Sequence, residues 1–155
     1  MTTHWTAEEA TRELMAVLPL LNRIIGAELR LEAGEDTTMP QFRLLALLQE
    51  QPQTLSALAA KRRVSLQAAG ESIQTLVERG WVTRTPDPVD RRQSLLDLSA
   101  VGRAHYDKAQ SRMLTRLIPL LEKLSTEEMD AVQCSLPALH RVLTSIEIEE
   151  QREPK

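Results

Sequence analysis

The stretch from Trp81 to Leu98 constrains the fold most, because it is the one passage of this sequence without a helical pattern. At both of its ends, β-branched or apolar residues nearly alternate with polar ones, which is typical of strands. Its middle, residues 86–93, holds two prolines and two aspartates, which favour a turn. We therefore predict a β-hairpin whose loop carries the adjacent Arg91 and Arg92. Since a lone hairpin is only marginally stable in water, it has to pack against flanking helices.

In the rest of the sequence, apolar residues recur at helical spacing, and capping residues indicate where the helices begin. Thr6 with Glu9, and Ser125 with Glu128, have the spacing of a capping box. Helices are predicted from Thr6 to about Leu31, from Thr38 or Pro40 to before Pro52, from Leu55 to Arg62 after an N-cap at Thr54, from Leu66 to Arg79 after an N-cap at Ser65, from Ser99 to Leu124, and from Ser125 onward.

The charge of the chain is unevenly distributed. A net charge of −3 and a pI near 5.7 argue against a nucleic-acid-binding protein. From Thr54 to Arg103, however, eight Lys or Arg residues stand against five acids, a balance of +3, and the remainder of the chain carries −6. This central segment is a locally positive module in an acidic chain, which is compatible with selective binding of a polyanion.

The third and fourth predicted helices follow each other closely. Val64 and its immediate neighbours separate them, which is the spacing of a helix-turn-helix. The face of the fourth helix that does not point into the core carries mostly short polar residues, namely Gln67, Ala68, Glu71, Ser72, Gln74 and Thr75. Such side chains suit hydrogen bonding to base edges in a DNA groove. A solvated helix face is the alternative that these residues alone leave open.

Other classes of site are not indicated. The single cysteine, Cys134, rules out an internal disulfide framework, and burial as an inert thiol is favoured over a redox role. His4, His105 and His140 lack metal-ligand spacing, so no metal is predicted. No nucleophile, phosphate-loop or paired-carboxylate pattern indicates an enzyme or a cofactor. The N-terminus lacks a signal-peptide pattern, and no apolar run approaches the ~18 residues of a membrane span, which predicts a cytoplasmic protein without a membrane partner.

Several short motifs resemble one known family. They are LSALAA from Leu55, Val64-Ser65, LVERGWV from Leu76, PDPVDRR from Pro86 and LSAVGR from Leu98. In residue type and spacing they resemble the winged helix-turn-helix core of the MarR family of bacterial transcription regulators. The Asp-x-Arg motif followed by Leu-Ser-x-x-Gly is the more specific part. With the helices before and after it, the resemblance extends over nearly the whole chain.

The resemblance implies a mainly α fold with a small β-hairpin wing. A winged helix-turn-helix lobe is expected over residues 36–99, and a helical dimerisation region over residues 1–35 and 100–155, within one continuous structural domain. The family's architecture further implies a homodimer that binds a palindromic operator in double-stranded DNA. Each copy would lay the helix at 66–79 in a major groove and its wing in a minor groove.

Matched residue by residue, Arg92 takes the place of the family's wing arginine and Asp90 that of the acid orienting it. A narrow minor groove concentrates negative potential that favours an inserted guanidinium. The recognition helix departs from the family, because Gly70-Glu71 stands where many members carry Thr-Arg. The predicted DNA-binding residues are Thr54, Lys61, Arg62, Arg63, Ser65, Gln67, Ala68, Glu71, Ser72, Thr75, Arg84, Asp90, Arg91 and Arg92.

The resemblance also implies a repressor whose operator binding is relieved by a small aromatic or apolar ligand. The candidate ligand-binding residues are Leu18, Arg23, Phe42, Arg43 and His105. The alternative is a winged-helix protein-interaction module with weak or no specific DNA binding, for which Glu71 and the acidic total are the motive. The sequence does not specify the operator, the regulated genes, the effector, repression as against activation, or whether Cys134 is redox-active.

Overall fold

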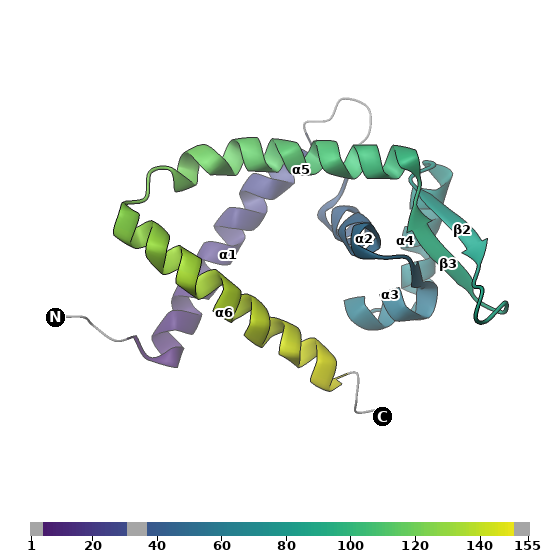
Figure 1. The fold of residues 1–155 in the computed structure, drawn as a ribbon, viewed down its shortest axis with the longest axis horizontal. Coiled ribbons are helices and arrows are strands. Elements are labelled where there is room, and N and C mark those ends of the chain that lie inside the picture. The colour runs from purple at the N-terminus through teal and green to yellow at the C-terminus, as the bar shows by residue number, and fades with distance from the viewer. Residues whose placement is uncertain (1–4, 31–36, 151–155) are drawn as a thin grey trace. The chain divides into compact units, whose positions relative to one another are not determined.

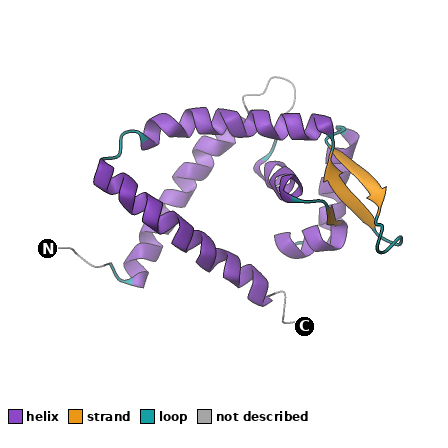
Figure 2. Ribbon diagram, in the orientation of Figure 1, coloured by secondary structure: helices purple, strands orange, loops and turns teal. Residues whose placement is uncertain are grey.

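The computed structural model describes residues 5–30 and 37–150, with side-chain burial up to residue 145. The elements in chain order are α1 (Ala7–Arg30), α2 (Met39–Glu50), β1 (Gln53–Thr54), α3 (Leu55–Arg62), α4 (Leu66–Glu78), β2 (Val82–Pro86), β3 (Ser94–Leu98), α5 (Ala100–Leu121) and α6 (Thr126–Glu150) (Figure 1). The predicted class, mainly α with a small hairpin, is confirmed (Figure 2). The chain divides into two compact units, residues 1–43 and 44–155.

In the first unit, α1 begins at the predicted capping box. The Thr6 N–H donates to Glu9 Oε2 over 2.8 Å, and the Glu9 N–H donates to Thr6 Oγ1 over 3.2 Å. The hydrogen bonds that the Thr6 N–H and then the Thr6 hydroxyl donate to the Glu9 carboxylate lower the pKa of Glu9 from its ordinary value. α2 begins in the same way, with Thr38 and Gln41 exchanging backbone-to-side-chain hydrogen bonds. Local sequence therefore determines where both helices start.

The helix-turn-helix is built from two capped helices and a tight turn. Thr54 Oγ1 accepts from the Ala57 N–H at the start of α3, and Ser65 Oγ accepts from the Ala68 N–H at the start of α4. Between them Arg63 adopts the left-handed conformation, with φ of 53°. The two helices bury a common apolar core whose fully buried members include Leu58, Ala69, Ile73 and Leu76. Both predicted N-caps are confirmed.

The hairpin belongs to a three-stranded antiparallel sheet of order β1-β3-β2. β2 pairs with β3 from Val82 opposite Leu98 to Pro86 opposite Ser94, and β1 pairs with the other edge of β3. The predicted hairpin is confirmed, whereas β1 was not predicted, because a two-residue strand has no periodicity to detect. Trp81, which we placed in the first arm, lies just before β2 and is buried in the core.

A close backbone contact joins the hairpin to α5. The Ser99 N–H donates to the Trp81 carbonyl over 2.9 Å, while Ser99 Oγ donates to the Gly80 carbonyl and accepts from the Gly102 N–H. Trp81 also stacks on the His105 ring, with centroids 3.8 Å apart. The first turn of α5 is therefore tied directly to the base of the hairpin.

Helix α5 is shorter than predicted. α5 ends at Leu121 rather than Leu124, because the Lys123 and Leu124 N–H groups bond three residues back, to the carbonyls of Leu120 and Leu121, and close the helix in a tight turn. The buried face of α5 contains Gly102, Ala109 and Met113, whereas the apolar residues Val101 and Ala104 are exposed.

Helix α6 begins at the predicted capping box, where the Ser125 N–H donates to Glu128 Oε2 and the Glu128 N–H donates to Ser125 Oγ. The predicted burial of Cys134 is wrong, because the residue is exposed on α6. A helix pattern does not distinguish a face buried within the chain from one that the chain leaves uncovered. No helix in the described ranges is long and apolar enough to cross a membrane.

Candidate nucleic-acid interface

Helix α4 presents the predicted polar face outward. Its opposite face is anchored in the core by Ala69, Ile73 and Leu76, which fixes its rotation about its own axis. On the outer face Gln67, Ala68 and Glu71 are exposed, and Ser72 and Thr75 are half-buried. Gln67 Nε2 donates to Glu71 Oε1 over 3.1 Å, so the Glu71 carboxylate is partly occupied by its own helix.

The hydroxyl groups on this face have a defined orientation. Ser72 Oγ donates to the Ala68 carbonyl and Thr75 Oγ1 donates to the Glu71 carbonyl, each four residues back. With their protons committed to the helix, both oxygens face outward mainly as hydrogen-bond acceptors. The face therefore offers an amide, a carboxylate and two acceptor hydroxyls to a partner.

Outside the loop between β2 and β3, the basic residues predicted to contact DNA lie in two places in the lobe. Lys61 and Arg62 are half-buried in the last turn of α3, and Arg63 is exposed in the turn that follows. Arg84 is exposed on β2, where its Nη2 donates to Gln74 Oε1 over 3.2 Å, and Gln74 Nε2 in turn donates to Glu78 Oε1. Strand β2 is thereby linked to the outer side of α4.

The wing loop between β2 and β3, residues 87–93, is held by its own side chains. Asp87 Oδ1 accepts from the N–H groups of Val89 and Asp90, at 2.8 and 3.5 Å. Backbone hydrogen bonds from the Asp87 N–H to the Gln93 carbonyl and from the Gln93 N–H to the Asp90 carbonyl close the loop. Arg91 and Arg92 are exposed on it.

Asp90 holds the backbone of the wing arginine. Its Oδ1 accepts from the Arg92 N–H over 3.0 Å and its Oδ2 accepts from Gln93 Nε2 over 3.1 Å. These hydrogen bonds, that from Arg92 first, lower the pKa of Asp90. Asp90 therefore orders the peptide that carries Arg92, whereas we had expected it to restrain the guanidinium directly.

Two residues of this region were missed by sequence reasoning. Ser56 Oγ, in the first turn of α3, donates to Gln93 Oε1 over 3.2 Å and lies 3.0 Å from Thr54 Oγ1. Ser56 and Gln93 are 37 positions apart in the sequence, and no local pattern predicts such a pair. Both also line an open cavity of about 390 Å³ with Leu55, Leu66, Arg84, Arg92, Ser94 and Leu96.

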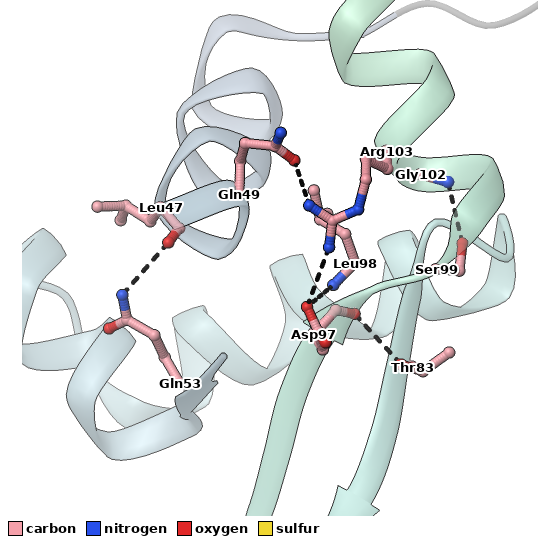
Figure 3. A network of polar contacts seen from close by, with 9 residues as sticks. All are labelled: Leu47, Gln49, Gln53, Thr83, Asp97, Leu98, Ser99, Gly102 and Arg103. Atoms are coloured by element: carbon pink, nitrogen blue, oxygen red, sulfur yellow. Dashed lines mark hydrogen bonds and ion pairs between the residues drawn. The ribbon is translucent and has the colours of Figure 1, made fainter. Parts of the chain in front are cut away.

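Arg103 of α5 was also missed, and it joins three elements (Figure 3). Its Nη1 donates to Gln49 Oε1 of α2 over 2.8 Å, and its Nη2 lies 3.7 Å from Asp97 Oδ1 of β3. Asp97 Oδ1 also accepts from the Leu98 N–H. The network positions the base of the wing relative to the helices beside it.

The residues predicted to bind a ligand have different environments. Leu18 and Arg23 are exposed on α1, Phe42 is half-buried and Arg43 exposed on α2, and His105 is buried against Trp81. Four of them belong to the unit 1–43, whereas His105 belongs to the unit 44–155. Their shared role stays a prediction. In the part of the chain that the structure describes, no group of three or more His, Cys, Asp or Glu residues could hold a metal ion.

Comparisons with known proteins agree with this geometry. Residues 35–93 match the model of the MarR family. An uncharacterized HTH-type transcriptional regulator of Mycobacterium leprae is 31% identical over 90 residues, which are 58% of this chain and 63% of that protein. The chain thus spans less than two thirds of this relative's length.

Solved structures extend the likeness beyond the lobe. The crystal structure of RV1404 from Mycobacterium tuberculosis has a TM-score of 0.78 and 26% identity, covering 91% of this chain and 97% of that one. Streptococcus pneumoniae FabT in complex with DNA has a TM-score of 0.75 and 19% identity, covering 91% and 99%. Residues 35–93 of this chain therefore match the MarR family, the chain shares the fold of these structures, and the resemblance predicted from the sequence is confirmed.

Proposed function

We propose that this protein is a transcription regulator that binds double-stranded operator DNA through its winged lobe. The observation that carries the proposal is that one lobe presents both a rotationally fixed polar face on α4 and two exposed arginines on an ordered wing loop. A helix of this kind fits the major groove, and a guanidinium fits a narrow minor groove. The FabT structure to which the fold is similar is a complex with DNA.

The charge distribution supports the same proposal. The segment from Thr54 to Arg103 has a balance of +3 within a chain of −3. Lys61, Arg63 and Arg84 would contact the phosphate backbone, which supplies affinity without sequence information. Sequence would then be read by α4 and by Arg92. The acidic remainder disfavours non-specific binding elsewhere on the protein.

We further propose that the regulator is a homodimer. Large apolar side chains are exposed along α6 at Leu136, Leu139 and Leu143, and their spacing places them on one face of the helix. Exposed apolar side chains also occur on α1 and on the C-terminal half of α5. Exposed apolar side chains that gather on several helices mark surfaces through which protein chains associate. A two-fold dimer presents two lobes and so matches a palindromic operator.

The proposed regulation is relief of repression by a small aromatic or apolar effector. This part rests on the family resemblance and on the candidate residues Leu18, Arg23, Phe42, Arg43 and His105. A ligand that binds better to the arrangement of lobes that does not fit DNA lowers operator affinity by linkage. A thermal-shift screen of aromatic acids checks it, because a ligand that binds only the folded dimer raises its apparent stability.

One observation favours a second candidate, a protein-interaction module without specific DNA binding. Glu71 is exposed on the α4 face, where its carboxylate would be repelled by phosphates unless it accepts a hydrogen bond from a cytosine amino group.

A gel-shift titration of the full chain against the promoter of its own gene separates the two functions. Regulation predicts a specific complex at low salt, which weakens as salt rises. An unrelated DNA of equal length is the control. An intact dimer that forms no specific complex at low salt would contradict DNA-dependent regulation and favour the interaction module.

A further inference from the structure

We propose that Gln93 is a positioning residue for the wing, setting where Arg92 stands relative to the helix-turn-helix. The inference rests on the proposed function, since it assigns Gln93 a part in DNA recognition by Arg92. Neither the sequence motifs nor the family match assigns Gln93 a role. The role follows from a chain of hydrogen bonds that begins at the N-cap of α3 and ends at the Arg92 peptide.

The two ends of the Gln93 side chain face different elements. Its Oε1 accepts from Ser56 Oγ over 3.2 Å, and Ser56 lies in the first turn of α3. Its Nε2 donates to Asp90 Oδ2 over 3.1 Å, within the wing loop. The side chain therefore bridges the wing loop and the helix-turn-helix, two segments that local sequence does not bring together.

Both ends of this bridge are themselves held. On the helix side, Ser56 Oγ lies 3.0 Å from Oγ1 of Thr54, the residue that caps α3. On the wing side, the second Asp90 oxygen accepts from the Arg92 N–H over 3.0 Å. Gln93 thus holds the carboxylate that in turn holds the Arg92 peptide. Its own backbone N–H and carbonyl bond to Asp90 and Asp87 and close the same loop.

Such a link matters because the wing extends beyond the rest of the sheet. The strands of the wing are held by the pairing of β2 with β3 and by the hydrogen bond from Arg84 to Gln74 of α4. Arg92 lies on the loop beyond these paired strands. A loop that moves independently of α4 must be ordered each time the protein binds DNA. Ordering it in advance lowers the entropy cost of binding, which is the principle of preorganisation. Gln93 supplies that order by connecting the loop to the helix-turn-helix.

An amide suits this place because it accepts and donates at the same time. A glutamate at position 93 keeps the size of the side chain and the acceptor toward Ser56. It loses the donor toward Asp90, however, and sets two carboxylates against each other. Gln93→Glu is therefore a sharp test, and Gln51→Glu, which adds the same charge at an exposed site between α2 and β1, is its matched control.

The experiment measures the operator affinity of the full chain for Gln93→Glu, Gln51→Glu, Ser56→Ala and Ser56→Thr, each with and without Arg92→Ala. We expect Gln93→Glu to weaken binding about tenfold more than Gln51→Glu, a coupling typical of neighbouring residues. Ser56→Ala should weaken binding, whereas Ser56→Thr, which keeps the hydroxyl, should bind the operator as the wild-type chain does. In the Arg92→Ala background the excess effect of Gln93→Glu should disappear, because the residue that it positions is gone.

Amide hydrogen exchange of Arg92 without DNA gives an independent readout. We expect exchange to be faster in Gln93→Glu and in Ser56→Ala than in Gln51→Glu. If the wild-type chain binds operator but Gln93→Glu matches Gln51→Glu in affinity and in exchange, the inference is overturned and the proposed function stands. If the wild-type chain forms no operator complex, the proposed function falls and the inference falls with it.

Discussion

At the scale of single residues, two helical glycines of this protein have opposite roles. Gly102 lies where α5 meets the base of the hairpin, and a Cβ built on it would stand 1.9 Å from the Trp81 carbonyl oxygen. Gly70 lies inside α4, where a Cβ would be 3.7 Å from Leu55 Cδ2, an ordinary contact distance. The first glycine is required by packing, whereas the second costs helix stability without a steric need.

Gly102→Ala should therefore destabilise the protein by about 1–3 kcal/mol, the usual cost of overpacking against a part that moves little. Here the clash is with backbone, so a rotamer change does not relieve it. The free energy of unfolding from urea titration measures the effect. A stability equal to wild type would show that α5 can move away from Trp81 at no cost.

Gly70→Ala should stabilise the protein by about 0.5–1 kcal/mol, because alanine loses less conformational freedom in a helix interior. The same urea titration measures it, which makes the two substitutions a matched pair. A destabilised Gly70→Ala variant would indicate that α4 and α3 pack more tightly at Leu55 than the structure shows.

The lowered pKa of Asp90 makes the order of the wing loop depend on pH. Hydrogen bonds from the Arg92 N–H and then from Gln93 favour the carboxylate. The order that this carboxylate provides is therefore present above the ordinary pKa of 3.8 and is lost as pH falls through the lower folded value. The Arg92 amide chemical shift should titrate with a midpoint below 3.8, and the transition should vanish in Asp90→Asn. A midpoint at or above 3.8 would contradict the hydrogen-bond geometry.

At the scale of elements, the wing combines two arginines with separate expected roles. Arg92 is held through its peptide by Asp90, whereas the Asp90 carboxylate makes no such bond to Arg91. We expect Arg92→Ala to weaken operator binding by about 1–3 kcal/mol if the guanidinium contacts a base, with relaxed specificity at that position. Arg91→Ala should weaken binding to all sequences alike. It should also lower the salt dependence, measured as the slope of log affinity against log salt concentration, by about one.

Fluorescence-anisotropy titrations of both variants over a range of salt concentrations distinguish the two roles. Operator DNA and a scrambled duplex of the same length provide the specificity measurement. Unchanged affinity in Arg92→Ala would show that the wing takes no part in recognition. Identical salt slopes and identical specificity losses in the two variants would show that their roles do not differ.

At the scale of the whole molecule, the exposed apolar residues of α6 predict association. Leu136 is 59% exposed in the single chain, and Leu143 is 54% exposed. We expect sedimentation to show a species of twice the 17.5 kDa chain mass, and Leu136→Glu to shift it toward monomer by placing a charge in the interface. Val89→Glu, at a wing-tip residue that is 94% exposed, is the control and should leave the mass unchanged. A folded wild-type monomer at micromolar concentration would contradict the proposed dimer.

Local sequence was sufficient for the features whose hydrogen bonds span three or four residues. The N-caps at Thr54 and Ser65 and the capping boxes at Thr6 and Ser125 have this range. The hairpin was also predicted, because its strand patterns flank a loop rich in turn residues. The family motifs then predicted a winged helix-turn-helix with Arg92 on the wing.

Tertiary structure alone decided the contacts between segments far apart in the chain. Strand β1 exists because β3 offers it an edge, Gly102 is needed because Trp81 lies against it, and Gln93 reaches Ser56 across 37 positions. None of these leaves a periodic or local signature. The sequence by itself determined where helices and strands begin and which family the lobe resembles, since those depend on near neighbours. Packing decided how the wing is held against the helices, since that depends on distances which only the folded chain establishes.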